Sequence, residues 1–427
     1  MEEAFLKKII IKSVRHIKNV EIPLSEMERK NLIVTGKNGV GKTSFLIALV
    51  SHLMEYFGKG SDGEIPIGHY IGRGKNTDDE KLIQEYERQF EFWTGVYASA
   101  GYNETWHHIG DSYLQRIYNE ASIFTDSTSD REIYNSYRSG KFIMAFFPAD
   151  RILSVDTVKS IENITLSRTS SLTDNCSKIF LKYLASLKAK QAFATVEGNL
   201  KLAESINQWF IKFDKMLKEV LEDDSIKLNF DSNTLQFDIT CNEKEAFDFN
   251  TLSSGYSAIL SIIIELLLRV PENNMTFFDT QGIVIIDEIE AHLHLELQKK
   301  IMPILTTMFP KIQFILSTHS PFILSSTPNA VIYDLQNRTL VKDGLNTLPY
   351  QGIVEGYFNV NTLSQQLLSY FSEYKKIAKK SEKSDDDYRK LAELELYLDE
   401  IPDYLAIDFS AEYKRIKLEL MTGGSPK

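Results

Sequence analysis

Residues 36–43 read Gly-Lys-Asn-Gly-Val-Gly-Lys-Thr, the complete G-x-x-x-x-G-K-[ST] pattern of a phosphate-binding loop. The apolar run 31–35 before it predicts a buried strand, and apolar residues at helical spacing predict a helix over Thr43–Phe57 after it. The three glycines allow backbone N–H groups to turn toward phosphate oxygens, and the helix N-terminus adds its positive dipole end. The stretch therefore predicts an α/β fold that binds a nucleoside triphosphate.

Each residue of this loop has an expected role. Lys42 would reach the β- and γ-phosphates of ATP and contribute to catalysis, and Thr43 would hold Mg²⁺. The other phosphate-contacting residues would be Gly36, Lys37, Asn38, Gly39, Val40, Gly41 and Ser44.

Composition limits the class of protein. The chain has 427 residues, of which 43% are hydrophobic, enough for two or three lobes. Its net charge of −11 argues against a surface that binds nucleic acid throughout, although one basic patch would be compatible with it. Two cysteines are too few for a disulfide framework, and neither a signal-peptide pattern nor an apolar run long enough to span a bilayer is present. We therefore expect a cytoplasmic protein with no membrane contact.

Strands and helices alternate through the chain, which favours an α/β core interrupted by insertions. The helical pattern from Thr173 to Glu222 breaks near residues 197–199 and predicts two antiparallel helices. The charged stretch 375–389 is expected to interrupt a helical tail. The predicted boundaries are core 1–57, an insertion of unknown role 58–140, core 141–172, a helical-pair insert 173–225, core 226–360 and tail 361–427.

A second nucleotide motif lies at Gly282–Glu288, a β-branched apolar run that ends in two carboxylates. This is the pattern of a Walker B strand, buried on both faces and opening on a ligand at its C-terminal edge. Asp287 would bind Mg²⁺, and Glu288 would polarise the water that attacks the γ-phosphate. Acidic residues that merely begin the next helix are the alternative interpretation.

Thr251-Leu-Ser-Ser-Gly-Tyr256, just before an apolar helix, resembles the L-S-G-G-Q signature of ABC-type ATPases in the form seen in the RecF, SMC and OLD branches. Ser254 and Tyr256 depart from the transporter form. The resemblance implies that Ser253, Ser254 and Gly255 meet the γ-phosphate of ATP held by another subunit, so a homodimer or higher oligomer would sandwich ATP. Without this context, Leu-Ser-Ser-Gly is also an ordinary helix cap.

His319, in Ser-Thr-His-Ser-Pro after another strand, resembles the switch histidine of this family, which hydrogen-bonds the γ-phosphate. Family resemblance also places His292 and His294 near the subunit interface, with zinc binding as the alternative.

Two further assignments rest on position. Asp150, after the strand 141–147, stands where related ATPases have a Q-loop that contacts Mg²⁺. Its neighbour Arg151, or a plain turn at Pro148, is the alternative. Arg15, between the first two strands, resembles a nucleotide-contacting basic residue of RecF-like heads, and a surface loop charge is the alternative.

The resemblance as a whole implies an ABC-type ATPase head with a mixed sheet, a helical insertion and a helical tail. An OLD-like head without a nuclease domain is similar to the ATPase subunits of two-gene anti-phage systems such as PARIS and Septu. This implies a slow switch ATPase, a separate nuclease effector chain and a phage protein as trigger.

Two alternatives remain. One is a RecF/SMC-like head that clamps DNA. Lysines 178, 182, 188 and 190 and the stretch Lys-Lys-Ile-Ala-Lys-Lys at 375–380 could contact nucleic acid, with solvated helix faces as the alternative interpretation. The other is a transporter subunit, disfavoured by the 245 residues (287 − 42) between the two nucleotide motifs.

Overall fold

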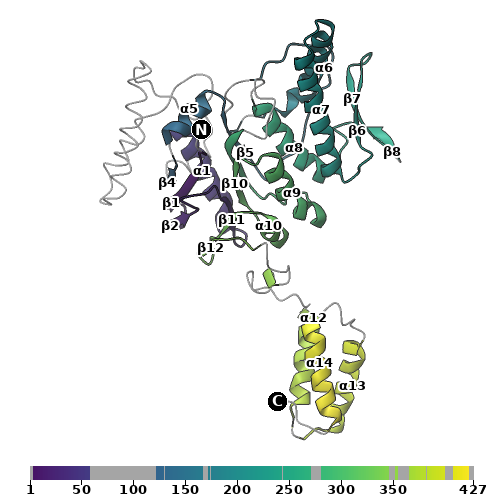
Figure 1. Ribbon diagram of the computed structural model, residues 1–427. Helices are drawn as coiled ribbons and strands as arrows, with labels where there is room; N and C mark the ends of the chain where they lie inside the picture. Colours follow the sequence, from purple (N-terminus) through teal and green to yellow (C-terminus); the bar gives the residue numbers. More distant parts are fainter. Residues whose placement is uncertain are drawn as a thin grey trace, which may run out of the picture. The chain divides into compact units, whose positions relative to one another are not determined.

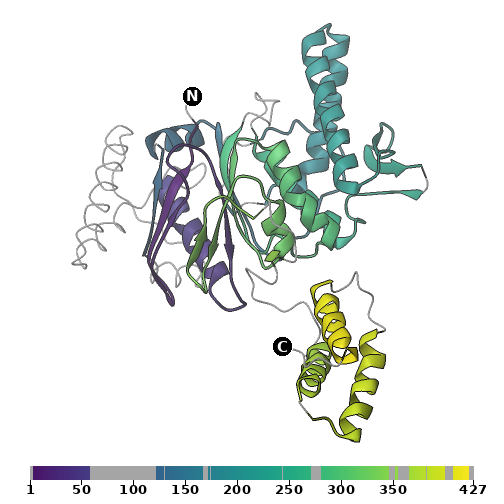
Figure 2. The same cartoon turned by 60° about the horizontal axis from the view of Figure 1, so that its bottom comes forward.

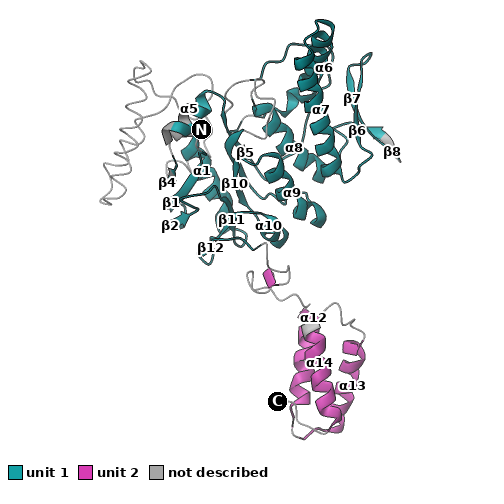
Figure 3. Cartoon of the chain, viewed as in Figure 1, with its two compact units in different colours: residues 1–347 teal, residues 348–427 magenta. Residues whose placement is uncertain are grey.

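The computed structural model describes residues 3–57, 122–128, 130–166, 172–173, 175–242, 244–270, 280–345, 352–353, 365–380, 382–399 and 407–422. The chain divides into two compact units, residues 1–347 and 348–427 (Figure 3). Residues 58–121 of the predicted insertion 58–140 lie outside the described residues.

The first unit is built on a six-stranded sheet with the order β12-β11-β3-β10-β9-β5 (Figure 1). Neighbouring strands are parallel except for the antiparallel edge strand β12. The strands are β3 (Asn31–Thr35), β5 (Phe142–Phe147), β9 (Gln281–Ile286), β10 (Ile312–Ser317), β11 (Ala330–Asp334) and β12 (Thr339–Val341). The predicted α/β fold with a mixed sheet is confirmed.

A second, antiparallel sheet has the order β2-β1-β4 and comprises β1 (Leu6–Val14), β2 (Ile17–Pro23) and β4 (Ser122–Ser127). Helix α1 (Lys42–Phe57) packs between the two sheets, with Phe45, Leu49 and Leu53 in their shared core (Figure 2). The end of the predicted insertion differs from expectation, because β4 pairs with β1 and α5 (Asp130–Arg138) contacts β5. Residues 122–138 therefore belong to the core.

Three helices cover the opposite face of the large sheet: α8 (Ser254–Arg269), α9 (Leu295–Met308) and α10 (Pro321–Ser326) (Figure 2). Helix α8 is almost wholly buried, and its Glu265–Arg269 ion pair of 2.9 Å lies in the interior. Helix α9 begins at Leu295 and not directly after β9, because the residues between them form a turn with His292 at φ 67°.

The helical pair α6 (Phe180–Val196) and α7 (Leu200–Leu221) extends from the edge of this unit, after the short helix η1 (Ser177–Ile179) (Figure 1). The side chain of Asn199 caps α7 by accepting from the N–H of Leu202. Beyond it, β6 (Lys227–Asp231), β7 (Gln236–Cys241) and β8 (Lys244–Phe247) form a three-stranded antiparallel sheet.

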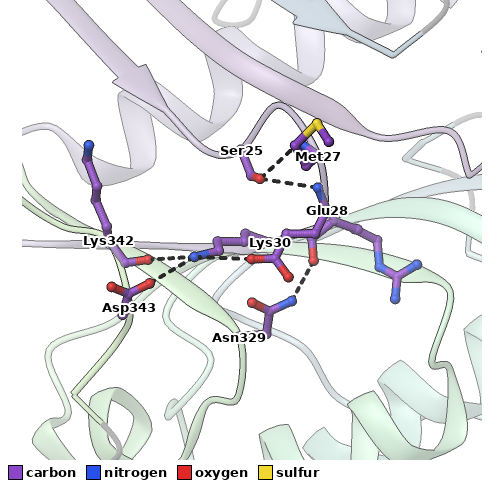
Figure 4. A network of polar contacts seen from close by, with 8 residues as sticks. Ser25, Met27, Glu28, Lys30, Asn329, Lys342 and Asp343 are labelled. Carbon is purple, nitrogen blue, oxygen red and sulfur yellow. Dashed lines mark hydrogen bonds and ion pairs between the residues drawn. The ribbon is translucent and has the colours of Figure 1, made fainter.

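Polar side chains link several segments around the start of β3. Lys30 donates from Nζ to the Lys342 carbonyl and pairs with Asp343 at 3.0 Å, while Asn329 reaches the Arg29 carbonyl (Figure 4). These bonds join the start of β3 to the segments next to β11 and β12 in the same sheet. The buried amide of Gln313 on β10 bonds the N–H and carbonyl of Leu6 on β1 at 2.8 and 3.0 Å, and it thereby links the antiparallel sheet to the large sheet.

The second unit contains three helices, α12 (Gln365–Ala378), α13 (Asp385–Asp399) and α14 (Ile407–Met421), around a small apolar core. Much of the predicted interruption at 375–389 is helical, since α12 continues to Ala378 and α13 starts at Asp385. Tyr374 and Tyr413 donate to the carboxylates of Glu395 and Asp399 inside this unit. Among the described residues, no helix is long and apolar enough to cross a membrane.

Candidate functional site

The C-terminal ends of four neighbouring strands converge at one edge of the large sheet. Ser317 on β10 is in register with Val34 on β3, and Leu316 is in register with Ile286 on β9. Phe147 on β5 pairs with the same Ile286. The phosphate loop, both Walker B carboxylates and the His319 loop therefore follow strand ends that lie side by side, the usual ligand position in a parallel sheet.

The phosphate loop has the backbone that its glycines predict. Gly36, Gly39 and Gly41 have φ of 134°, 80° and 98°. A Cβ on Gly36 would lie 2.9 Å from Cγ1 of Val40, so both its conformation and its packing require glycine. Residues 37–39 are exposed, and Thr43 is exposed at the start of α1.

The ammonium group of Lys42 caps this loop. Lys42 is 6% exposed, and its Nζ donates to the carbonyls of Gly36 and Lys37 at 2.9 and 3.3 Å. Burial lowers its pKa, and the charges of Glu288, Glu290, Asp287 and Asp334 oppose that shift. A buried cation among carboxylates, held by loop carbonyls, can interact with phosphate oxygens that enter the loop.

The Walker B turn is held by Ser317 of the adjacent strand. The Ser317 hydroxyl donates to Oδ1 of Asp287 and accepts from the backbone N–H of Glu288, the latter at 2.8 Å. Asp287 is 4% exposed, whereas Glu288 is half-buried and has a left-handed backbone at φ 42°. Ser317 thus fixes both motif residues, one through its carboxylate and the other through its backbone.

Glu290 is a site residue that the sequence analysis missed. Its carboxylate accepts from the Thr318 hydroxyl at 2.7 Å and from the backbone N–H of His319. It therefore ties the turn after β9 to the loop after β10. The sequence offers only its position, two residues beyond Glu288, as a signal.

His319 faces the same set of charges. Burial lowers the pKa of its imidazole, and the nearby charge of Lys42 lowers it further, so the ring is neutral at pH 7. In the part of the chain that the structure describes, Nε2 of His319 is buried and has no hydrogen-bond partner. An orphaned ring nitrogen beside Lys42 is an open position for a polar group of a ligand.

Asp150 and Arg151 occupy opposite environments. The structure places the predicted metal ligand Asp150 on the surface, while Arg151 is only 5% exposed. The Arg151 guanidinium donates to the carbonyls of Pro148, Asp287, Glu288 and Ile289. The side chain of Arg151 is thus bonded to backbone carbonyls of the Walker B turn.

The predicted signature residues lie at the start of α8. Ser253 is the N-cap but its hydroxyl makes no capping bond, and both Ser253 and Ser254 are exposed. Gly255 packs against the turn after β9, where a Cβ would lie 3.0 Å from the carbonyl of His292. Both serines are consequently exposed at the start of α8, a helix that lies on the face of the large sheet opposite α1 (Figure 2).

Arg15 is exposed in the β1–β2 turn with φ 53°. Its neighbour His16, which the sequence analysis did not select, contacts the phosphate loop through Nε2 at 2.8 Å from the Val40 carbonyl.

His292 and His294 are exposed, and the His294 ring makes an edge contact with Tyr256 of the signature. Within the described residues, no group of three or more His, Cys, Asp or Glu side chains could hold a metal ion.

The candidate basic surface on α6 is partly engaged within the protein. Lys182 pairs with Asp156 at 3.6 Å, and Lys188 lies over the ring of Phe210, 4.0 Å from its centroid. In the tail, Lys375 and Lys380 pair with Glu412 and Asp387. These contacts weaken the case for a continuous surface that binds nucleic acid.

Residues 195–325 match the family model described as "AAA domain, putative AbiEii toxin, Type IV TA system". This segment includes the signature, the Walker B strand and His319. It covers less than half of the chain.

Two curated proteins are similar over longer stretches. The Septu protein PtuA of Bacillus mycoides (strain KBAB4) is 24% identical over 442 residues, covering 98% of this chain and 55% of the relative. The Retron Vc95 probable ATPase of Vibrio cholerae serotype O1 biovar El Tor is 28% identical over 243 residues, covering 52% and 44%. The chain thus spans about half the length of these relatives.

Among solved structures, an SmcHead bound to the C-winged helix domain of ScpA aligns with a TM-score of 0.41 and 10% identity, covering 81% of this chain and 100% of that one. At this TM-score the fold class rests on the strand order and motifs of the chain itself. The chain is an α/β protein with a phosphate-loop motif, and it is similar to Septu PtuA and to a retron probable ATPase.

Proposed function

We propose that the chain is a Mg²⁺-dependent ATPase that acts as the switch subunit of an anti-phage defence complex. The supporting observation is the convergence at one sheet edge of Lys42, the Asp287–Glu288 pair and the His319 ring with its unpartnered Nε2. Cation, carboxylates and imidazole are the groups that a γ-phosphate, its metal ion and an attacking water require.

The residues present fit these ligands. The glycine loop exposes its backbone to phosphates, and the Thr43 hydroxyl with the Asp287 carboxylate offers the oxygen ligands that Mg²⁺ prefers. The metal would neutralise phosphate charge when bound. Glu288 would take the proton of the attacking water, and His319 would donate to the γ-phosphate through Nε2, with its proton on that nitrogen.

The proposed site is completed by a second copy of the chain. Ser253 and Gly255 are positioned at an exposed helix start, where a hydroxyl and free N–H groups suit an anion. Two ATP molecules would lie between two heads, each held by the phosphate loop of one and the signature of the other. Hydrolysis would then reopen the dimer.

The defence role is proposed from the similarity to Septu PtuA and the retron ATPase. A separate nuclease chain would be the effector, as the resemblance to the ATPase subunits of two-gene anti-phage systems implies. A phage protein would be the trigger.

The biochemical proposal is tested with purified full chain, Mg²⁺ and ATP. Wild type should bind ATP, hydrolyse it slowly and dimerise in its presence. Lys42→Ala should do none of these, and Ser253→Arg should bind ATP without dimerising. An ATP affinity that Lys42→Ala leaves unchanged would refute the assigned pocket.

The cellular proposal is tested by phage plating on a host that carries the chain with its neighbouring genes. Protection should be lost with Lys42→Ala. ATP-dependent tight binding to duplex DNA, falling steeply with salt, would instead support a DNA-clamping ATPase.

A further inference from the structure

Arg151 makes an unusual set of contacts with the Walker B turn. Its Nη1 donates to the carbonyl of Asp287 at 2.9 Å, and its Nη2 donates to those of Glu288 and Ile289 at 3.0 and 2.8 Å. A fourth bond, to Pro148 at 3.0 Å, closes its own loop. One guanidinium therefore holds three consecutive carbonyls in the turn that carries both catalytic-site carboxylates.

Three consecutive carbonyls converge on one point only if the backbone leaves regular strand geometry. Glu288 supplies that departure through its left-handed φ of 42°. A non-glycine residue keeps this conformation only where its surroundings enforce it, and converging carbonyl dipoles repel each other unless a cation lies between them. Arg151 supplies this cation at a position 136 residues away in the sequence.

The environment of Arg151 suits this task. The side chain is 5% exposed, and burial lowers its pKa to about 10 while the charges of Glu290, Asp287 and Glu288 oppose the shift. The group therefore stays protonated at neutral pH. A planar guanidinium can serve several acceptors at once, whereas a lysine ammonium is a single point charge.

The segment that carries Arg151 is itself anchored. The N–H of Leu153 donates to the Ser257 hydroxyl on α8 at 3.0 Å, and the backbone of Val155 exchanges two bonds with the Asn250 side chain. These bonds fix the segment that carries Arg151, and the segment in turn fixes where the Arg151 guanidinium lies relative to residues 287–289.

We propose that Arg151 is a positioning residue for ATP hydrolysis, one that sets the Glu288 carboxylate by clamping the backbone of residues 287–289 without touching the nucleotide. The inference rests on the proposed function. In this proposal, the residue after β5 that serves hydrolysis is Arg151, which holds the backbone of the Walker B turn, and not Asp150 as a direct metal ligand.

The test compares Arg151→Lys and Arg151→Met with wild type in the full chain, measuring the affinity for Mg·ATP and the single-turnover rate of hydrolysis. We expect a rate loss of about 10- to 100-fold for lysine and more for methionine, because displacing a catalytic group by about 1 Å costs on the order of 100-fold. Affinity should change little, since Lys42 and its loop are untouched.

Arg269→Lys is the matched control. Arg269 is also buried, with 4% exposure, and donates to the Met144 carbonyl and to Glu265, away from the Walker B turn. It should keep the wild-type rate. The lysine variant at 151 keeps the charge, so it provides the test even if methionine prevents folding.

A double variant separates positioning from general stability. In a Glu288→Gln background, Arg151→Lys should cause no further rate loss, because it acts through the carboxylate that is already gone. Three results would each overturn the inference. They are a double variant whose rate loss is the product of the two single losses, an unchanged rate in Arg151→Lys, and an affinity in Arg151→Lys that falls as much as the rate. A wild-type chain that does not hydrolyse ATP would overturn the proposed function itself and this inference with it.

Discussion

Replacing Glu288 by glutamine removes the proposed proton acceptor while keeping the size of the side chain. The bonds described at this residue are made by its backbone, with the N–H bonded to Ser317 at 2.8 Å and the carbonyl to Arg151 at 3.0 Å. Neither bond involves the carboxylate. The substitution should therefore leave the turn intact and change only the chemistry of one half-buried group.

The magnitude follows from that separation. Transfer of a proton to a positioned base contributes about 10²- to 10⁴-fold to rate. This corresponds to roughly 2.7–5.4 kcal/mol of activation free energy at 1.36 kcal/mol per factor of ten. ATP binding should be retained, because Lys42 keeps its bonds to the loop carbonyls and loses one neighbouring negative charge.

Single-turnover release of phosphate measures the rate, and size-exclusion chromatography with Mg·ATP measures the dimer, which should accumulate because it no longer reopens. Glu296→Gln is the control, since Glu296 is an exposed carboxylate that pairs with Lys299 at 2.9 Å. A Glu288→Gln chain that hydrolyses bound ATP at the wild-type rate would refute the assignment and make Glu290 the next candidate base.

Three further outcomes are expected. Gly36→Ala should weaken ATP binding about 5- to 150-fold. A side chain at φ 134° would meet Cγ1 of Val40 at 2.9 Å, and such strain costs about 1–3 kcal/mol. Titration with a fluorescent ATP analogue measures the affinity, and an unchanged affinity would contradict the loop geometry. Ser317→Ala should destabilise the chain by about 1–3 kcal/mol for each orphaned group in urea unfolding, because it removes a donor to Asp287 and an acceptor for the Glu288 N–H. Ser261→Ala, which loses only a bond within α8, should cost much less, and equal costs would argue against the Ser317 bridge. In the tail unit, burial and then the bonds to Glu395 and Asp399 raise the pKa of Tyr374 and Tyr413. Their contribution to the stability of the folded unit is therefore complete below the ordinary tyrosine pKa of about 10, and it is lost as pH rises above that value toward the raised pKa. Limited proteolysis at pH 8 and pH 10.5 should show cleavage of α12–α14 increasing at the higher pH, less steeply in Tyr374→Phe, and equal cleavage at both values would contradict this.

Local patterns were sufficient for most elements of the core. The apolar run before the phosphate loop and the run 312–317 are strands because both faces of a parallel sheet are buried, which leaves an uninterrupted hydrophobic signal. The two helices of the insert were predicted from helical spacing and from the break at 197–199.

Elements that depend on distant partners were not predicted. Strand β4 pairs with β1 across more than a hundred residues, so no local pattern indicates its place in the core. The turn after β9 is also not evident from local spacing, because apolar residues continue at helical intervals into α9, whereas the left-handed His292 prevents helix before Leu295.

The supporting shell of the site was hidden for the same reason. The bonds of Ser317 and Glu290 span 28 to 30 residues, and only the placement of β10 beside β9 brings the bonded groups together. Arg151 was considered as a nucleotide contact because the sequence gives its position after β5. Its backbone acceptors in the turn after β9 are visible only in three dimensions.

The turn that carries Asp287 and Glu288 is bonded from both sides within the protein, by Ser317 of β10 and by Arg151 after β5. Preorganised catalytic groups need little rearrangement when substrate arrives. The Ser253 hydroxyl, by contrast, makes no capping bond and is exposed. In the proposed dimer, the Walker B turn would therefore be ready for hydrolysis before assembly, and arrival of the partner's signature would be the step that controls the rate. Hydrolysis that rises with the square of chain concentration below the dimerisation constant would support this order, and a specific activity independent of concentration there would refute it.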